Sequence, residues 1–138
     1  MIKQIPYGLT DFGRIQKENY YYVDKTMFIE KIEMQPSYLF LIRPRRFGKS
    51  LTLAMLEAYY DVRYADQFDE LFGHLYIGQH PTPIHNQFLI MRFNFSEVSP
   101  HVNEVEESFR LHCCGKLSDF VYRYAHLLGT DIWTVLDD

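Results

Sequence analysis

Gly48, Lys49 and Ser50 have the residue types and spacing of a phosphate-binding loop. The first amides of a helix have no partner within the helix, and the helix dipole favours an anion beside them. A lysine at this position reaches the β- and γ-phosphates of a nucleotide, and a following serine hydroxyl holds Mg²⁺. These three residues therefore predict nucleotide binding, with Ser50 as the protein ligand of a nucleotide-bound Mg²⁺.

The segment before Gly48 is unusually basic. The common pattern is G-x-x-x-x-G-K-[ST], but Arg43 stands where the first glycine belongs, and the octet reads R-P-R-R-F-G-K-S. Cations near a helix N-terminus oppose the helix dipole. Arg43, Arg45, Arg46 and Lys49 would be a poor choice at such a helix start unless they face an anion. The pattern therefore favours a phosphate site over a plain basic turn.

A strand, a tight loop and a helix would position this octet. Tyr38–Ile42 is a run of large apolar residues, which is typical of a strand buried on both faces of a parallel sheet. Pro44 lacks an amide donor and ends that run. Lys49–Tyr60 carries apolar residues at every fourth position and predicts an amphipathic helix.

Other parts of the chain predict further elements. Phe88–Phe95 begins as an apolar run and ends in alternation, which predicts a second strand. Helical spacing predicts short helices around Phe12–Ile15, Lys25–Met34 and Phe68–Phe72, and a long one from about Val102 to Leu128, continuous or broken at Gly115. Thr10 or Asp11 would cap the first of these helices, and Asp24 the second.

Composition excludes several classes of protein. The 138 residues are 47% hydrophobic and 23% charged, a globular balance that excludes disordered, collagen-like and coiled-coil chains. The longest apolar run is far shorter than the roughly 20 residues that a membrane span needs. The N-terminus has no apolar signal region, and Cys113 and Cys114 are too close to bridge easily, so we expect a reducing, cytoplasmic location. The aromatic residues are spread along the chain, which favours core filling over base stacking.

Two blocks of sequence resemble the AAA-ATPase-like family of P-loop proteins, whose members are mostly bacterial. Tyr22–Thr26 reads YVDKT and Arg43–Ser50 reads RPRRFGKS, in the order in which that family carries them. The resemblance covers roughly Ile5 to Ser96. It implies a RecA/AAA-type α/β fold, a parallel sheet flanked by helices, that binds ATP and Mg²⁺. Full-length members often continue into a PD-(D/E)XK nuclease-like domain, of which nothing is visible here.

The resemblance also implies the residues of the nucleotide site. Lys49 would contact the β- and γ-phosphates, and Ser50 would ligate Mg²⁺. The whole set of implied binding residues is Arg43, Pro44, Arg45, Arg46, Phe47, Gly48, Lys49, Ser50 and Leu51. For Asp24-Lys25-Thr26 the residues offer no mechanism, and a helix cap at Asp24 is favoured over ligand contact.

The acid residues of a Walker B strand are not evident. Phe88–Phe95 is followed by Ser96 and Glu97 and lacks an aspartate at its end. Trp133–Asp138 ends in acids, but its apolar run is short, and we interpret it as a chance match. We therefore expect little or no hydrolysis from this chain, catalytic residues remain unassigned, and residues 1–138 are interpreted as the N-terminal part of an incomplete domain.

In an AAA-type sheet the strands predicted at Tyr38–Ile42 and Phe88–Phe95 are not neighbours. Three outcomes remain open: the two strands pair directly, a second chain or a missing C-terminal half completes the sheet through its open edges, or the sequence is a truncated piece, which we favour. Two alternative functions also remain. One is binding of nucleic-acid phosphates, which the net charge of −4 disfavours. The other is a non-catalytic interaction fragment.

Overall fold

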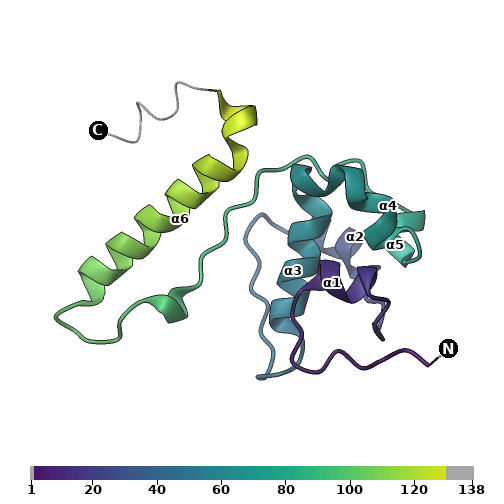
Figure 1. The fold of residues 1–138 in the computed structure, drawn as a ribbon, viewed down its shortest axis with the longest axis horizontal. Coiled ribbons are helices and arrows are strands. Elements are labelled where there is room, and N and C mark those ends of the chain that lie inside the picture. Colours follow the sequence, from purple (N-terminus) through teal and green to yellow (C-terminus); the bar gives the residue numbers. More distant parts are fainter. Residues whose placement is uncertain (1, 130–138) are drawn as a thin grey trace. The chain divides into compact units, whose positions relative to one another are not determined.

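The computed structural model describes residues 2–129, which form helices joined by extended segments (Figure 1). The chain divides into two compact units, Met1–Phe88 and Leu89–Asp138. Each unit is described by itself. Within residues 2–129, no helix combines the length and the apolar character that a membrane crossing requires.

The first unit is a small helical domain around an aromatic core. Its elements are α1 (Phe12–Lys17), α2 (Phe28–Glu33), α3 (Lys49–Tyr60), the 3₁₀ helix η1 (Val62–Gln67), α4 (Phe68–Phe72) and α5 (Tyr76–Gln79). Phe12, Tyr59 and Phe72 are almost fully buried. The ring centroid of Phe72 lies 5.0 Å from that of Phe12 and 5.5 Å from that of Tyr59. Core filling is therefore confirmed for these rings.

Several local predictions are confirmed. Helix α3 has the predicted bounds, and α4 forms where its apolar residues predicted it. Asp11 caps α1, because its carboxylate accepts a hydrogen bond from the amide of Arg14 at 3.0 Å. Helix α2 is shorter than predicted and begins after Met27, so Asp24 is not its N-cap.

The predicted α/β fold with a parallel sheet is wrong for the described residues. Residues 2–129 contain no strand and no sheet, only an isolated parallel bridge between Asp61 and Phe88. The segment 38–42 is extended and exposed: Phe40 is 92% and Ile42 90% accessible to solvent. The open sheet edges that were expected to recruit a partner are therefore also absent from this part of the chain. An apolar run favours burial, but a strand also needs a second segment that supplies a hydrogen-bond ladder.

The second predicted strand is also replaced by other contacts. The amide and carbonyl of Phe88 bond to the backbone of Tyr60 and Val62, at 2.9 and 3.0 Å. Farther along, the hydroxyl of Tyr124 accepts a hydrogen bond from the amide of Ile90 at 2.9 Å. These backbone groups are thus satisfied without a neighbouring strand.

The second unit contains η2 (Phe95–Glu97) and the long helix α6 (Val105–Leu128). Helix α6 runs through Gly115 without a break, so the continuous alternative is the correct one. Asn94 caps η2 by accepting a hydrogen bond from the amide of Ser96 at 3.3 Å. The acidic stretch Trp133–Asp138 lies outside the described residues.

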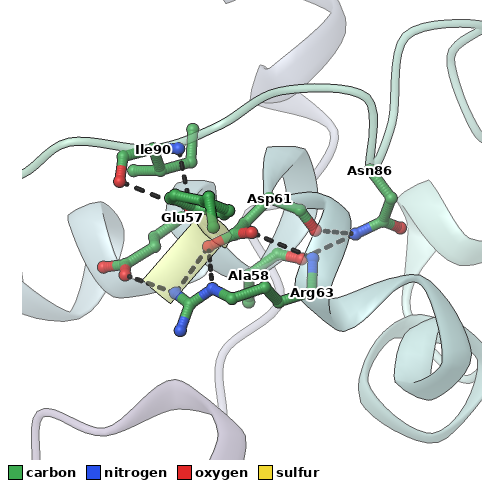
Figure 2. A network of polar contacts seen from close by, with 7 residues as sticks. Glu57, Ala58, Asp61, Arg63, Asn86 and Ile90 are labelled. Carbon is green, nitrogen blue, oxygen red and sulfur yellow. Dashed lines mark hydrogen bonds and ion pairs between the residues drawn. The ribbon is translucent and has the colours of Figure 1, made fainter. Parts of the chain in front are cut away.

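The C-terminal end of α3 is held by residue Asn86, which belongs to a later loop. Its side-chain nitrogen donates to the carbonyls of Ala58 and Asp61, at 3.2 and 2.8 Å (Figure 2). Its own amide donates to the carbonyl of Tyr59 at 2.8 Å. The last carbonyls of a helix have no partner inside it, and here a single asparagine and its neighbours supply those partners.

An ion pair strengthens the same end. Asp61 is completely buried, and its Oδ2 lies 2.6 Å from a guanidinium nitrogen of Arg63 (Figure 2). Its Oδ1 accepts a hydrogen bond from the amide of Arg63 at 2.9 Å and thereby caps η1. Glu57 is a second carboxylate beside Arg63, at 3.6 Å. The buried carboxylate of Asp61 is therefore both neutralised and hydrogen-bonded, as burial of a charge requires.

Candidate functional site

The basic loop enters α3 through two residues with left-handed backbone. Arg46 has φ 67° and Gly48 has φ 76°, whereas Phe47 between them has a negative φ. A turn holds the loop, because the amide of Phe47 donates to the carbonyl of Pro44 at 3.4 Å. The guanidinium of Arg43 donates to the carbonyl of Phe47 at 3.3 Å. Alternation of φ sign along a short segment turns successive amides toward one side of the backbone.

Helix α3 begins directly after Gly48. No side chain caps this end, and its first turn holds no acidic residue. The amide and hydroxyl of Thr52 both donate to the carbonyl of Gly48, at 2.8 and 2.9 Å. The amides of Lys49, Ser50 and Leu51 precede that first bond, so the helix itself gives them no acceptor.

Four cations surround this helix start. Arg45, Arg46 and Lys49 are exposed, and Arg43 is half-buried. Among the ion pairs within residues 2–129, none involves any of these four side chains. The positive charges of these four side chains and the positive end of the helix dipole together give this end of α3 a positive potential.

A cavity of about 560 Å³ lies against the loop in the same unit. One wall comes from the loop and α3, and includes Phe47, Gly48 and Thr52. The other wall comes from the segment 21–32 and includes Tyr22 and Phe28. The cavity thus has walls from both sequence blocks, YVDKT and RPRRFGKS, although the 16 residues 27–42 separate them in the chain.

Asp24 and Thr26 anchor the YVDKT block to the core. One carboxylate oxygen of Asp24 accepts hydrogen bonds from the amide and hydroxyl of Thr26, at 2.8 and 2.7 Å. Its other oxygen accepts from the amide of Tyr76 at 2.7 Å, at the start of α5. The hydroxyl of the fully buried Thr26 accepts from the amide of Ile77 at 3.1 Å. Asp24 therefore does hold a helix start, but that of α5 rather than α2.

The electrostatics of this block follow from the same contacts. Burial opposes the charged form of Asp24, but the hydrogen bonds from Thr26 and Tyr76 outweigh it and leave the pKa of this carboxyl below its usual value. Burial, with a smaller contribution from the charge of Asp24, raises the pKa of the Tyr22 hydroxyl to about 12. Asp24 is thus an ionised structural residue, and Tyr22 a neutral wall residue, at neutral pH.

The structure places the predicted site residues in two groups. Pro44, Arg45, Arg46, Phe47 and Gly48 form the exposed turn, with Arg43 at its base. Lys49, Ser50 and Leu51 form the first turn of α3, where Leu51 packs against the core. Sequence reasoning missed the second wall of the cavity. The order of the two sequence blocks indicated only a family resemblance, and a helix cap at Asp24 was favoured over ligand contact, so no signal in the sequence pointed to this wall.

A basic loop that leads into an open helix start is an arrangement that many phosphate-binding proteins use. This chain belongs to the AAA-ATPase-like family: the family model described as "Predicted AAA-ATPase" matches residues 6–137. A protein of Azotobacter chroococcum mcd 1, described as an uncharacterized protein in the vnfD 5′ region, is 49% identical over 55 residues. That match covers 39% of this chain and 11% of the relative. No solved structure matches the chain.

Proposed function

We propose that Arg43–Ser50 binds the triphosphate of ATP together with Mg²⁺. The observation that carries the proposal is a set of four cations without ion-pair partners among the described residues, gathered at a helix start whose first amides also lack acceptors. Both features stabilise an anion at the same place. Membership of an AAA-ATPase-like family supports the choice of a nucleotide as that anion.

The local backbone fits a phosphate group. Nothing lies within 4 Å of the position that a side chain on Gly48 would occupy, so the helix start is open to a ligand. The alternating φ signs at Arg46, Phe47 and Gly48 are those of a backbone nest for anions. Lys49 would neutralise the β- and γ-phosphates, and the hydroxyl of Ser50 would be the protein ligand of Mg²⁺. Held there by Ser50, Mg²⁺ would supply positive charge that offsets the charge of the phosphates.

The proposal also includes an expectation about ATP hydrolysis. We expect binding without appreciable hydrolysis, because the walls of the cavity beside the loop include no aspartate or glutamate that could position water. The catalytic residues of an ATPase would therefore have to come from elsewhere. Release of inorganic phosphate from MgATP measures this directly, and repeated turnover by the purified chain would contradict it.

Isothermal titration of the purified chain with MgATP tests the binding proposal. We expect a saturable signal that Lys49→Ala abolishes, because this substitution removes the charge placed at the helix start. Lys3→Ala is the matched control, since Lys3 is an exposed lysine outside the loop and should leave binding unchanged. Absence of binding by the wild-type chain, or equal binding by Lys49→Ala, would overturn the proposal.

A second titration separates ATP from polymeric phosphate. If the loop recognised nucleic acid, single-stranded and duplex oligonucleotides would bind with an affinity that falls steeply with salt concentration. We expect instead that MgATP binds and that oligonucleotides compete weakly. Tight oligonucleotide binding that MgATP does not displace would show that the ligand class is wrong.

A further inference from the structure

We infer that the exposed segment 38–49 binds the surface of an anionic lipid bilayer. This segment joins the apolar run Tyr38–Ile42 directly to the basic loop. The inference goes beyond the proposed function, because it concerns the solvent-facing side chains of the apolar run, which the proposed phosphate site does not use. It places the chain on a membrane surface and not across the membrane.

Three large apolar side chains protrude from the extended part of this segment. The exposed fractions are 89% for Tyr38, 92% for Phe40 and 90% for Ile42. The residues between them, Leu39 and Leu41, are only 53% and 42% exposed. Alternate side chains of an extended chain point to opposite faces, so the three protruding side chains share the face that is turned to solvent. An apolar face of this kind is unfavourable in water and favours an occupant.

The same segment is strongly basic. Residues 34–56 contain no acidic side chain, but they include Arg43, Arg45, Arg46 and Lys49. No ion pair within residues 2–129 involves any of these four side chains. Positive and negative side chains balance over residues 1–88 as a whole, so the positive charge of the loop is a local feature of this unit. The occupant of the exposed face should therefore carry negative charge.

Phe47 adds an apolar side chain inside the basic loop. It is 66% exposed and lies between Arg46 and Gly48. Aromatic side chains are enriched at membrane–water interfaces, and basic side chains beside them are attracted to anionic headgroups. The strength of binding at such an interface grows with the apolar area inserted and with the electrostatic attraction. The segment 38–49 offers both contributions within a few residues.

A second copy of this chain fits the same face less well. A symmetric dimer places the same patch of both copies against each other. Arg43, Arg45 and Arg46 of one copy would then approach the same cations of the other copy, and like charges repel. An anionic bilayer supplies an apolar interior and negative headgroups together, so it satisfies both features of the segment without this repulsion.

Co-sedimentation of the purified chain with lipid vesicles tests the inference. One set of vesicles is a mixture of phosphatidylcholine and phosphatidylserine, and the other is phosphatidylcholine alone. We expect at least about tenfold stronger partitioning onto the mixed vesicles, because each cation near an anionic surface contributes a gain of about fivefold. A rising salt concentration should weaken this binding, since salt screens exposed charges.

A double variant tests the apolar contribution. Phe40→Ser/Ile42→Ser removes two protruding side chains and should lower the partitioning at least about tenfold. The matched control is Ile2→Ser/Tyr7→Ser, because Ile2 and Tyr7 are 97% and 98% exposed and lie outside the segment. This control should partition like the wild-type chain. Phe40→Ser/Ile42→Ser should leave binding of MgATP unchanged, because the proposed phosphate site does not include these side chains.

A single charge reversal tests the electrostatic contribution. Arg45→Glu should lower the partitioning onto the mixed vesicles at least about fivefold. Lys3→Glu makes the same change in net charge at an exposed position outside the segment and should leave the partitioning unchanged. Retained helical circular dichroism verifies that each variant is folded.

The outcomes decide between a bilayer and the other occupants. Failure of the wild-type chain to bind the mixed vesicles, or equal binding to both kinds of vesicle, would overturn the inference. Equal partitioning of wild type and Phe40→Ser/Ile42→Ser would also overturn it, because the apolar face would then not contact lipid. Sedimentation velocity without lipid tests the second copy: an oligomer that this double variant dissociates would show that the face is a protein interface and would overturn the inference. None of these outcomes depends on MgATP, so the proposed function is tested separately.

Discussion

The two ends of α3 differ in almost every physical respect. At the C-terminal end, the side-chain amide of Asn86 donates hydrogen bonds to the carbonyls of Ala58 and Asp61, and the buried Asp61 carboxylate pairs with Arg63 (Figure 2). At the N-terminal end no side chain caps the helix, and four cations accumulate where an anion would be favourable. The first end satisfies its polar groups internally, whereas the second leaves them available.

This difference separates stability from binding along one helix. Polar groups that the fold itself satisfies contribute to the free energy of unfolding, because breaking them exposes a buried charge or an unpaired carbonyl. Groups that the fold leaves unsatisfied contribute little to stability and can be used by a ligand. Substitutions at the two ends should therefore change different measurements.

The largest expected effect is on the buried end. Asp61→Ala removes the acceptor of three hydrogen bonds from Arg63 and should lower the free energy of unfolding by about 2–4 kcal/mol. Lys49→Ala at the open end should change it by less than about 0.5 kcal/mol. Denaturation by urea, followed by circular dichroism, measures both. Similar losses of stability in the two variants would contradict the contrast between the ends.

A glycine-to-alanine pair should give effects of opposite sign. Gly48 has φ 76°, and Gly48→Ala should destabilise the chain by about 1–2 kcal/mol because a Cβ disfavours the left-handed region. Gly115 lies inside α6 with open space around it, and Gly115→Ala should stabilise that helix by about 0.5–1 kcal/mol. Thermal unfolding of the two variants measures the difference. Stabilisation by Gly48→Ala would show that the loop does not need its left-handed entry into α3.

The smallest expected effect concerns the start of α5, where the Asp24 carboxylate accepts a hydrogen bond from the amide of Tyr76. The start of α3, by contrast, has no such carboxylate. The pKa of Asp24 is lower in the folded chain than its ordinary value of 3.8. Its contribution to stability is therefore complete above that value and is lost as the pH falls through it toward the lower folded pKa. The free energy of unfolding, measured by urea denaturation at a series of pH values from neutral to acidic, should show this loss. Asp24→Asn should reduce the slope of that free energy against pH. An unchanged slope in Asp24→Asn would mean that the carboxylate is not held by these hydrogen bonds.

Local sequence patterns predicted the elements whose formation depends on near neighbours. The period of apolar residues predicted α3 and α4. It also predicted α6, whose 24 residues continue through Gly115 although a glycine inside a helix costs about 1 kcal/mol. Asp11 was correctly among the candidates for the cap of α1, because a cap and its helix are adjacent. In each case the stabilising partner lies within a few residues.

Features that depend on distant partners were not predicted correctly. The apolar run 38–42 gave no information about which segment could complete a ladder with it, and the predicted sheet is absent from the described residues. Asp24 was recognised as a capping residue, but its target, the amide of Tyr76, lies 52 positions away. The octet itself predicted the basic helix start, whereas the cavity beside it depends on the distant segment 21–32, which forms its other wall.

The length of α3 has a consequence for engineering. Its 12 residues place its two ends about 18 Å apart, at a rise of about 1.5 Å per residue. Salt at physiological ionic strength screens exposed charges over about 8 Å. Asp61 and Arg63 also neutralise each other, so at about 18 Å this pair should contribute little to the potential at a ligand beside Lys49. Substitutions of charged side chains at the C-terminal end of α3 should consequently change the thermal stability of this unit without changing the affinity of the loop for its ligand.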